Sequence, residues 1–293
     1  MKVAMFPRSP WWRANPYLGL LESGLRQHGV ACADDPNDGL SWGWLLAQRG
    51  QVQVLHFHWL EYHYDRAGQL ASALAFVLFM AKLVLARGLG YRIAWTVHNL
   101  QPHEPKHPKP RPRLLVGDGT AGAHRHHPLR GHPSPTHPAL RPPHDAHIHV
   151  LPHPNYTSSY ASPPSCEAAR QQLGLAHAHR VYLYFGAVRP YKGIEEAIAA
   201  FGQVADPQAR LLIVGQPLND EIRARIQALA DKDARVQTVF EYVPDEQLPT
   251  YYAAADMVVL PFRNVTTSGS AILAMSLGKP VLTASLGLFA RTG

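Results

Sequence analysis

The chain has 293 residues, of which 46% are hydrophobic, and a formal net charge of +7. This length suffices for two domains with separate cores, and the composition excludes a disordered or fibrous protein. Residues 105–150 hold seven cations and two anions and so supply +5 of the +7. The remainder is nearly neutral, which argues against a nucleic-acid partner.

The first residues give no sign of export. Pro7, Arg8 and Pro10 interrupt the only apolar run at the N-terminus, so we expect no signal peptide. Cys32 and Cys166 lie far apart and form no Cys-x-x-Cys pair. These observations predict reduced, structural thiols in a cytoplasmic protein.

The first half of the chain alternates predicted strands with predicted helices. Leucines at helical spacing predict a helix that begins near residue 16 and ends at Gly29. A second helix is expected at 70–86, and short apolar runs predict strands at 2–7, 52–59 and 91–100. Such alternation is typical of a parallel sheet that helices cover on both faces.

The most apolar stretch is LASALAFVLFMAKLVLARG, residues 70–88. Its uninterrupted part is only about 17 residues long and carries Lys82, whereas a membrane span needs about 20. We therefore expect a well-buried helix, the alternative being a helix that docks against a membrane surface.

The second half repeats the strand–helix pattern after an opening helix at 164–174. Apolar runs predict strands at 180–188, 209–215, 236–243 and 256–262, with one more starting in KPVLTA. Helices are expected between them at 193–204, 220–233, 245–255 and 268–278. The whole chain is thus predicted to be α/β, with two Rossmann-like domains at 1–155 and 164–293.

Ligands of such sheets bind outside the carboxyl ends of the strands, so polar residues there are the first site candidates. In FGAVRPYKG, Arg189 and Lys192 follow a strand and precede a helix, where two cations can clamp a diphosphate. A solvated turn is the alternative. Thr267, Ser268 and Gly269 would let a phosphate approach backbone amides, although Ser and Thr are also ordinary helix caps.

Three histidines follow strands in the first half. His56 and His58 alternate in LHFHW, which we interpret as placing them on opposite faces of one strand. This favours a polar wall over a metal site. His98 ends what we expect to be the central strand, where it would hydrogen-bond a sugar hydroxyl or act as a base. The alternative is a purely structural histidine.

These segments together resemble a known family. WTVHNLQPHE, YFGAVRPYKGIEEAIAAF, LLIVGQP, YVPDEQLPTYYAAADMVVLPF and TSGSAILAMSLGKPV occur in the order seen in GT-B glycosyltransferases. The resemblance is strongest to the bacterial group-1, family 4-like enzymes and covers roughly residues 1–105 and 150–290. It implies transfer of a sugar from a nucleotide-sugar to an acceptor hydroxyl, with the donor held mainly by the second domain in the cleft between the two.

The resemblance also assigns roles to the donor-side residues. Arg189 and Lys192 match the diphosphate-binding pair, and residues 267–269 match the loop around the donor phosphates. Tyr242 and Val243 fall where the family packs the nucleobase.

On the acceptor side, His98 matches the first-domain histidine near the reacting sugar and is the catalytic candidate. Asn15, His58 and Asn99 are placed beside the acceptor. The acceptor would be a glycan or a lipid-linked one, met in the cytoplasm or at the inner face of a membrane.

One departure limits what the family implies. Retaining members carry two glutamates eight residues apart before the Gly-x-Pro-Val ending, and Val265 and Leu273 stand at these positions here. The resemblance therefore predicts neither the stereochemistry of the transfer nor the donor sugar. We identify no Asp-x-Asp metal motif at the carboxyl end of a predicted strand, so we expect a metal-independent enzyme without a cofactor.

In residues 106–147, apolar side chains recur at neither the helix period nor the strand period. AHRHHPLRGHPSPTHPALRPPH (123–144) is typical of the segment, whose prolines forbid a continuous helix and would break a strand ladder. A His-rich metal tract and a disordered insertion are alternatives. We favour a local reading-frame error, because GC-rich DNA read out of frame yields Pro, His, Arg and Gly, and the family pattern resumes at 148–152.

The chain stops at LTASLGLFARTG, where the resemblance predicts further helices, so we expect a truncated C-terminus. The predicted function is a glycosyltransferase, acting in bacterial surface or exopolysaccharide synthesis. The alternative is an inactive remnant that at most binds nucleotide. A sugar-phosphate-binding or epimerase-type enzyme is a weaker alternative, since it would need an acid–histidine set that the sequence does not show.

Overall fold

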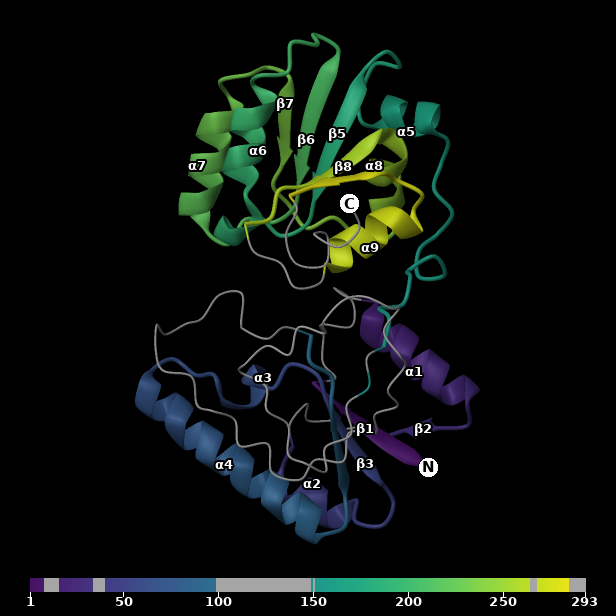
Figure 1. Cartoon of the computed structure of the whole chain (residues 1–293), viewed down its shortest axis with the longest axis vertical. Helices are drawn as coiled ribbons and strands as arrows, with labels where there is room; N and C mark the ends of the chain where they lie inside the picture. The colour runs from purple at the N-terminus through teal and green to yellow at the C-terminus, as the bar shows by residue number, and fades with distance from the viewer. Residues whose placement is uncertain (8–15, 34–39, 99–148, 150, 264–267, 285–293) are drawn as a thin grey trace, which may run out of the picture. The chain divides into compact units, whose positions relative to one another are not determined.

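The chain divides into two compact units, Met1–Pro152 and His153–Gly293 (Figure 1). The computed structural model describes residues 1–7, 16–33, 40–98, 149, 151–263 and 268–284. Residues 106–147, for which a reading-frame error is predicted, lie outside these ranges.

The first unit is built on a parallel sheet. Its described strands are β1 (Lys2–Phe6), β2 (Ala31–Cys32), β3 (Val54–Phe57) and β4 (Arg92–Trp95), in the order β2-β1-β3-β4. The strands predicted around 2–7, 52–59 and 91–100 are confirmed. Sequence patterns missed β2, because two residues are too few to show a period.

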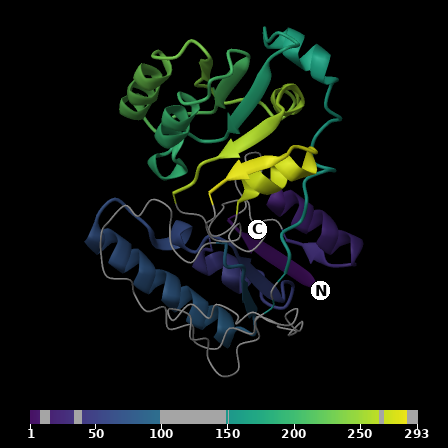
Figure 2. The same ribbon diagram turned by 45° about the horizontal axis from the view of Figure 1, so that its top comes forward.

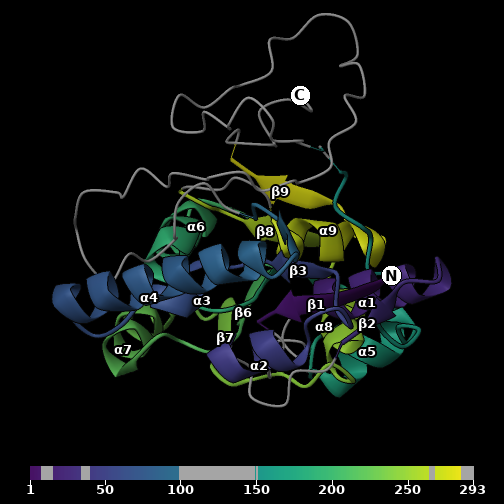
Figure 3. The ribbon, with the colours of Figure 1, turned by 90° about the horizontal axis from the view of Figure 1, so that it is seen from below.

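Helices lie on both faces of this sheet. Helix α1 (Tyr17–Gln27) packs its leucines against Val3, Met5 and Cys32, and it ends before Gly29, whose φ of +72° suits glycine. The opposite face carries Phe6, Leu55 and Phe57, which pack with residues of α2 (Trp42–Ala47) and α4 (Gln69–Gly88). The short helix α3 (Glu61–Tyr64) lies beside α4 (Figure 3).

The prediction that 70–86 forms a well-buried helix is half wrong. The helix exists as α4, but Phe79 and Ala86 are its only buried residues. The sheet covers one face of α4, whereas Leu70 and Val84 remain 88% and 69% exposed. Its apolar character therefore extends beyond what the core of the unit needs.

The second unit contains a five-stranded parallel sheet with the order β7-β6-β5-β8-β9 (Figure 2). Its strands are β5 (Arg180–Phe185), β6 (Ala209–Val214), β7 (Val236–Val239), β8 (Met257–Leu260) and β9 (Val281–Thr283). In chain order, this sheet begins at its central strand β5 and adds β6 and β7 on one side. Strands β8 and β9 then follow on the other side of β5. The strand order therefore reverses between β5 and β8, the place where doubly wound sheets bind ligands.

Helices cover both faces of the second sheet as well. The described helices are α5 (Cys166–Gln172), the 3₁₀ turn η1 (Pro190–Lys192), α6 (Ile194–Phe201), α7 (Asp220–Ala230), α8 (Leu248–Ala254) and α9 (Gly269–Ser276). Isoleucines of α6 and α7 pack on Tyr184, Leu211 and Ile213, which project from one face of the sheet. Strand residues alternate between faces, so the neighbouring Leu183 and Leu212 bury the other face.

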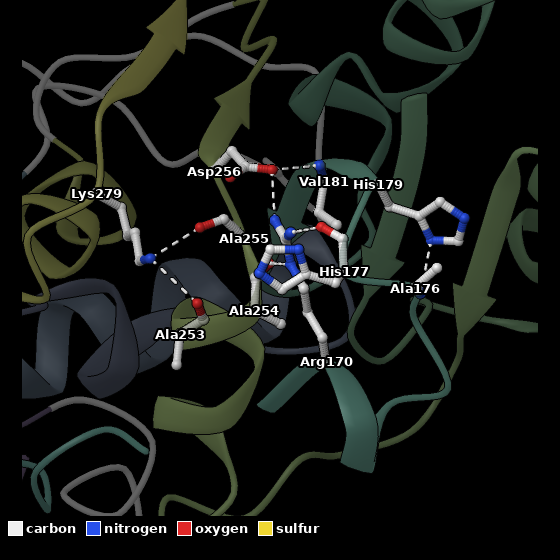
Figure 4. A network of polar contacts seen from close by, with 10 residues as sticks. All are labelled: Arg170, Ala176, His177, His179, Val181, Ala253, Ala254, Ala255, Asp256 and Lys279. Carbon is white, nitrogen blue, oxygen red and sulfur yellow. Dashed lines mark hydrogen bonds and ion pairs between the residues drawn. The ribbon is translucent and has the colours of Figure 1, made fainter. Parts of the chain in front are cut away.

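A polar network joins α5 to α8 and β8 in the second unit (Figure 4). The buried Arg170 donates to the carbonyl oxygens of Ala254 and His177 and to Oδ2 of Asp256, at 2.7 to 3.1 Å. The same Oδ2 accepts the backbone N–H of Val181 at 2.7 Å. The arrangement satisfies a buried guanidinium and anchors the start of β5.

Candidate functional site

The loops after β5 and β6 form one rigid corner of the second unit. The N–H of Val188 donates to Gln216 O at 3.0 Å, and the N–H of Leu218 donates back to Val188 O at 3.1 Å. At the base of these loops, Gly215 has a φ of +144°, and a Cβ there would overlap the carbonyl oxygen of Gly186. The glycines are therefore required for the loops to approach so closely.

Arg189 extends from this corner. Its backbone is extended, and its Nη1 donates to Val188 O at 3.1 Å and to Gln216 O at 3.2 Å. The half-buried guanidinium is thus oriented by two carbonyl groups of the linked loops.

Lys192 lies at the end of the 3₁₀ turn that follows Arg189. Its Nζ lies 4.2 Å from the ring centroid of Phe262 and 5.3 Å from that of Tyr191. Burial, and then the charge of Arg189, lower the pKa of Lys192 to about 8. The two neighbouring cations each disfavour the charge of the other, so an anion that binds between them would be favoured.

Gly193 connects this corner to β8. Its φ is +70°, and a Cβ there would overlap the carbonyl oxygen of Pro261. Phe262 follows Pro261 directly, so the close approach at Gly193 brings the ring of Phe262 to Lys192. The cation pair therefore lies at the reversal of strand order between β5 and β8.

The N-terminus of α9 belongs to the same region. A Cβ at Gly186, just after β5, would lie 3.7 Å from Ser270 Oγ. Ser268 is buried and its Oγ accepts the N–H of Ala271 at 3.2 Å, which makes it the helix cap. Gly269 is exposed, as an approaching phosphate would require. Thr267 lies outside the described residues.

The other donor-side candidates are Tyr242 and Val243, which follow β7. Tyr242 is 58% exposed and Val243 is buried. This suits the ring of Tyr242 to stack on a planar base while Val243 holds the loop in place. The family role of both residues remains a prediction.

Leu273, at one of the two positions where retaining relatives carry glutamate, is buried in α9. Val265, the other position, lies outside the described residues. Leu273 offers a ligand no hydrogen-bonding group.

Two residues of this region were missed by sequence reasoning. Phe262 contacts Lys192, and the hydroxyl of Tyr156 would lie 3.5 Å from a Cβ at Gly269. The signal for Phe262 was its position at the carboxyl end of β8 in VVLPF. Tyr156 precedes all strands of its unit, so no strand pattern points to it.

Three histidines of the first unit, His56, His58 and His98, lie near the carboxyl ends of β3 and β4. The rings of His56 and His58 are 4.3 Å apart, so the prediction that they face opposite sides is wrong. Successive strand residues alternate between faces, and residues two apart therefore share a face. His56 Nε2 is 2.8 Å from Thr96 Oγ1, and His58 Nδ1 is 3.2 Å from His98 Nε2.

His98 is enclosed by aromatic rings. It stacks on Trp59 with a centroid distance of 4.5 Å and meets the edge of Tyr17 at 4.9 Å. The strand that precedes it, β4, lies at the outer end of the described order β2-β1-β3-β4. Among the described strands the expectation of a central strand is not met, because β1 and β3 pair with each other in the middle. Asn15 and Asn99 lie outside the described residues.

Burial controls the charge of this histidine cluster. It lowers the pKa of His56 to about 4, and burial with the neighbouring His56 and His98 lowers that of His58 to about 2. Both imidazoles are therefore neutral at pH 7 and exchange hydrogen bonds without adding charge. Among the described residues, no group of three or more His, Cys, Asp or Glu side chains could hold a metal ion.

Comparison with known proteins identifies the second unit. Residues 165–292 match the family of group 1 glycosyl transferases. This segment therefore has the sequence pattern of the group 1 glycosyl transferases. The chain is 32% identical, over 235 residues, to a GDP-mannose:glycolipid 4-beta-D-mannosyltransferase of Xanthomonas campestris pv. campestris. That alignment covers 79% of this chain and 61% of the relative, so the chain spans about three fifths of the relative's length.

Solved glycosyltransferases share the fold of nearly the whole chain. Sucrose-phosphate synthase of Thermosynechococcus elongatus superposes with a TM-score of 0.67 at 18% identity, covering 98% of this chain and 82% of that one. Anabaena HepE in complex with UDP and glucose gives 0.61 at 17% identity, covering 99% and 82%. The resemblance to group-1 enzymes and the GT-B fold of two Rossmann-like sheets are therefore confirmed.

Proposed function

We propose that the chain transfers a sugar from a nucleotide-sugar to an acceptor hydroxyl in the synthesis of a bacterial surface polysaccharide or exopolysaccharide. One observation carries this proposal. Arg189 and Lys192 lie together at the strand-order reversal of the second unit, where Arg189 Nη1 donates to Gln216 O at 3.2 Å and Lys192 Nζ lies 4.2 Å from the ring centroid of Phe262. A diphosphate carries enough negative charge to bind both cations at such a strand end.

The relatives supply the first substrates to try. The Xanthomonas relative is named for GDP-mannose and a glycolipid, and HepE was solved with UDP and glucose. We therefore propose a nucleoside-diphosphate sugar as donor and a glycan or lipid-linked glycan as acceptor, without a metal or cofactor. We also propose a cytoplasmic protein that makes peripheral contact with the inner face of a membrane.

The transfer balances without a redox partner. The acceptor oxygen forms a bond to the anomeric carbon, while the bond from that carbon to the diphosphate oxygen breaks. The electron pair leaves with the diphosphate, whose growing charge Arg189 and Lys192 stabilise. The acceptor proton passes to a base or to water.

We propose that His98 acts at the sugar. The buried, neutral His58 holds a hydrogen bond to His98 Nε2, and Trp59 stacks on the His98 ring, so its orientation is fixed. An imidazole fixed in this way can bond a sugar hydroxyl or accept the acceptor proton.

Calorimetry with GDP, UDP and GDP-mannose tests the donor site. Arg189→Ala and Lys192→Ala should each weaken nucleotide binding about tenfold or more, because each removes a charge-assisted contact. Lys232→Ala, at an exposed lysine after α7, is the matched control and should bind as the original chain does. Equal affinity in all four proteins would show that the donor site is wrongly placed.

Transfer itself is measured with radiolabelled GDP-mannose and a lipid-linked glycan acceptor. His98→Asn should retain nucleotide binding and lose about 10²-fold or more in transfer rate. Nucleotide binding without any transfer by the unmodified chain would favour the alternative function, a remnant that only binds nucleotide.

A further inference from the structure

Helix α4 carries an apolar face that the described fold leaves uncovered. Its side chains at 70, 74, 77, 78 and 84 recur at helical spacing, and all are leucine or valine between 47% and 88% exposed. Phe79 and Ala86 lie on the opposite side and pack into the core. Soluble surfaces rarely carry so continuous an aliphatic strip without a partner.

The chemistry of the face indicates what covers it. Leu, Val and Ala side chains offer no hydrogen-bond donor or acceptor, whereas interfaces between proteins combine an apolar centre with a polar rim. The helix contains no acidic residue, and its only charges are Lys82 and Arg87, towards its C-terminal end. Aliphatic chains and cations together match a bilayer that contains anionic lipid.

Exposed aromatic side chains lie on helices that neighbour α4. Trp42 of α2 and Tyr62 of α3 are each 42% exposed, and Lys82 Nζ lies 5.8 Å from the ring centroid of Trp42. Tyrosine and tryptophan favour the boundary between hydrocarbon and water, because they have an apolar body and a polar atom.

Helix α4 is long and apolar enough to cross a membrane, but its packing favours a helix that lies in the surface plane. Phe79 stacks on His63 with parallel rings 4.7 Å apart, and Tyr91, just after α4, donates to Leu45 O at 2.7 Å. Crossing the bilayer would take Phe79 and Ala86 out of the core of the first unit.

We propose that the exposed face of α4, the helix labelled in Figure 3, docks in the plane of an anionic lipid bilayer. The face is formed by Leu70, Leu74, Val77, Leu78 and Val84. The inference deepens the proposed membrane contact and rests on that part of the proposed function. It places the first unit, with its histidine cluster, at the surface where a lipid-linked acceptor is embedded.

Flotation with vesicles tests the proposal. The full chain should float with vesicles that contain about a third phosphatidylglycerol in phosphatidylcholine, and less with phosphatidylcholine alone. Leu74→Gln/Val77→Gln should lower the partition coefficient about tenfold or more, because it removes two aliphatic side chains from the docking face. Glutamine is a good helix former, so the variant should retain its circular dichroism and melting temperature.

The control replaces apolar side chains of similar exposure in the second unit. Met275→Gln/Leu282→Gln should leave vesicle binding unchanged, since neither residue belongs to α4. Equal flotation of Leu74→Gln/Val77→Gln and the original chain would overturn the proposal. So would a dimer that this variant dissociates in light scattering, because a second copy would then occupy the face.

Nucleotide calorimetry on the same proteins separates this inference from the proposed donor site. Leu74→Gln/Val77→Gln should bind GDP normally and lose vesicle binding, whereas Arg189→Ala should show the reverse. Loss of both properties in either variant would indicate misfolding, which circular dichroism detects. A correctly folded original chain that binds neither type of vesicle would overturn the docking proposal alone.

Discussion

A lysine held among aromatic rings loses hydration that the rings only partly replace. The ammonium of Lys192 contacts Phe262 and Tyr191, and its pKa of about 8 lies below the ordinary value of 10.5. The folded chain therefore binds fewer protons than the unfolded chain between pH 8 and 10.5. The resulting loss of stability is fully present below pH 8 and is relieved as the pH rises towards 10.5. A diphosphate would offset the same cost by supplying an anion.

The lowered pKa predicts a pH dependence of nucleotide binding. Affinity for GDP should fall as the pH rises through about 8, because the free protein then loses the Lys192 cation. Isothermal calorimetry in a series of buffers would show this fall. Lys192→Arg should shift the fall to higher pH, since a guanidinium stays protonated. An affinity that is flat from pH 7 to 9.5 in the original chain would contradict the role of Lys192.

At the scale of elements, two motifs that mark the family have structural roles here. Asp256, of Ala-Ala-Asp, joins Arg170 of α5 to the start of β5 through a single oxygen. Lys279, of Gly-Lys-Pro-Val, donates to Ala253 O at 3.2 Å and Ala255 O at 2.8 Å, at the C-terminus of α8 (Figure 4). Both residues stabilise the positions of elements whose loops carry the proposed donor-site residues.

Removing the carboxylate of Asp256 should therefore destabilise the fold. Asp256→Ala leaves the buried Arg170 without its counterion and the N–H of Val181 without its acceptor, which should cost about 2 kcal/mol or more. Urea denaturation measures this loss. Asp231→Ala, at an exposed carboxylate after α7, should change stability by less than about 0.5 kcal/mol.

A second variant tests whether the buried, unpaired charge of Arg170 causes this loss of stability. In Arg170→Met/Asp256→Ala the buried charge is gone, so part of the lost stability should return. If the double variant is less stable than Asp256→Ala by the full cost of Arg170→Met, the two residues act independently.

Strands and helices that contain several regularly spaced apolar residues could be predicted from the sequence. Contacts between these elements could not. The strands β5, β6 and β8 follow from runs such as VYLYF and MVVL, and the site at their ends follows from parallel topology. The partners of Lys192 could not be inferred, because the approach of Gly193 to Pro261 joins residues 68 positions apart. Burial of α4 was misjudged for the same reason, since an apolar residue can face the core or a membrane equally well.

At the scale of the whole molecule, two confirmed sheets flank a segment of different composition. The described strands and helices before residue 99 and after residue 152 follow the family order. Residues 105–150 instead concentrate most of the net charge and much of the histidine and proline. A chain whose sequence pattern stops and resumes at nearly the family's spacing favours the hypothesis of a changed reading frame over that of a disordered insertion.

The reading-frame hypothesis predicts a specific result at the level of DNA. Translation of the codons for 106–147 in another frame should yield apolar runs at strand and helix periods, because paired compensating shifts preserve length while changing every residue between them. Resequencing the gene, together with translation of all three frames, measures this. The hypothesis fails if the sequence is confirmed and all three frames are rich in proline and lack any apolar period. A restored frame would supply core side chains that the present segment lacks, so the restored protein should also unfold at higher urea concentration than the present chain.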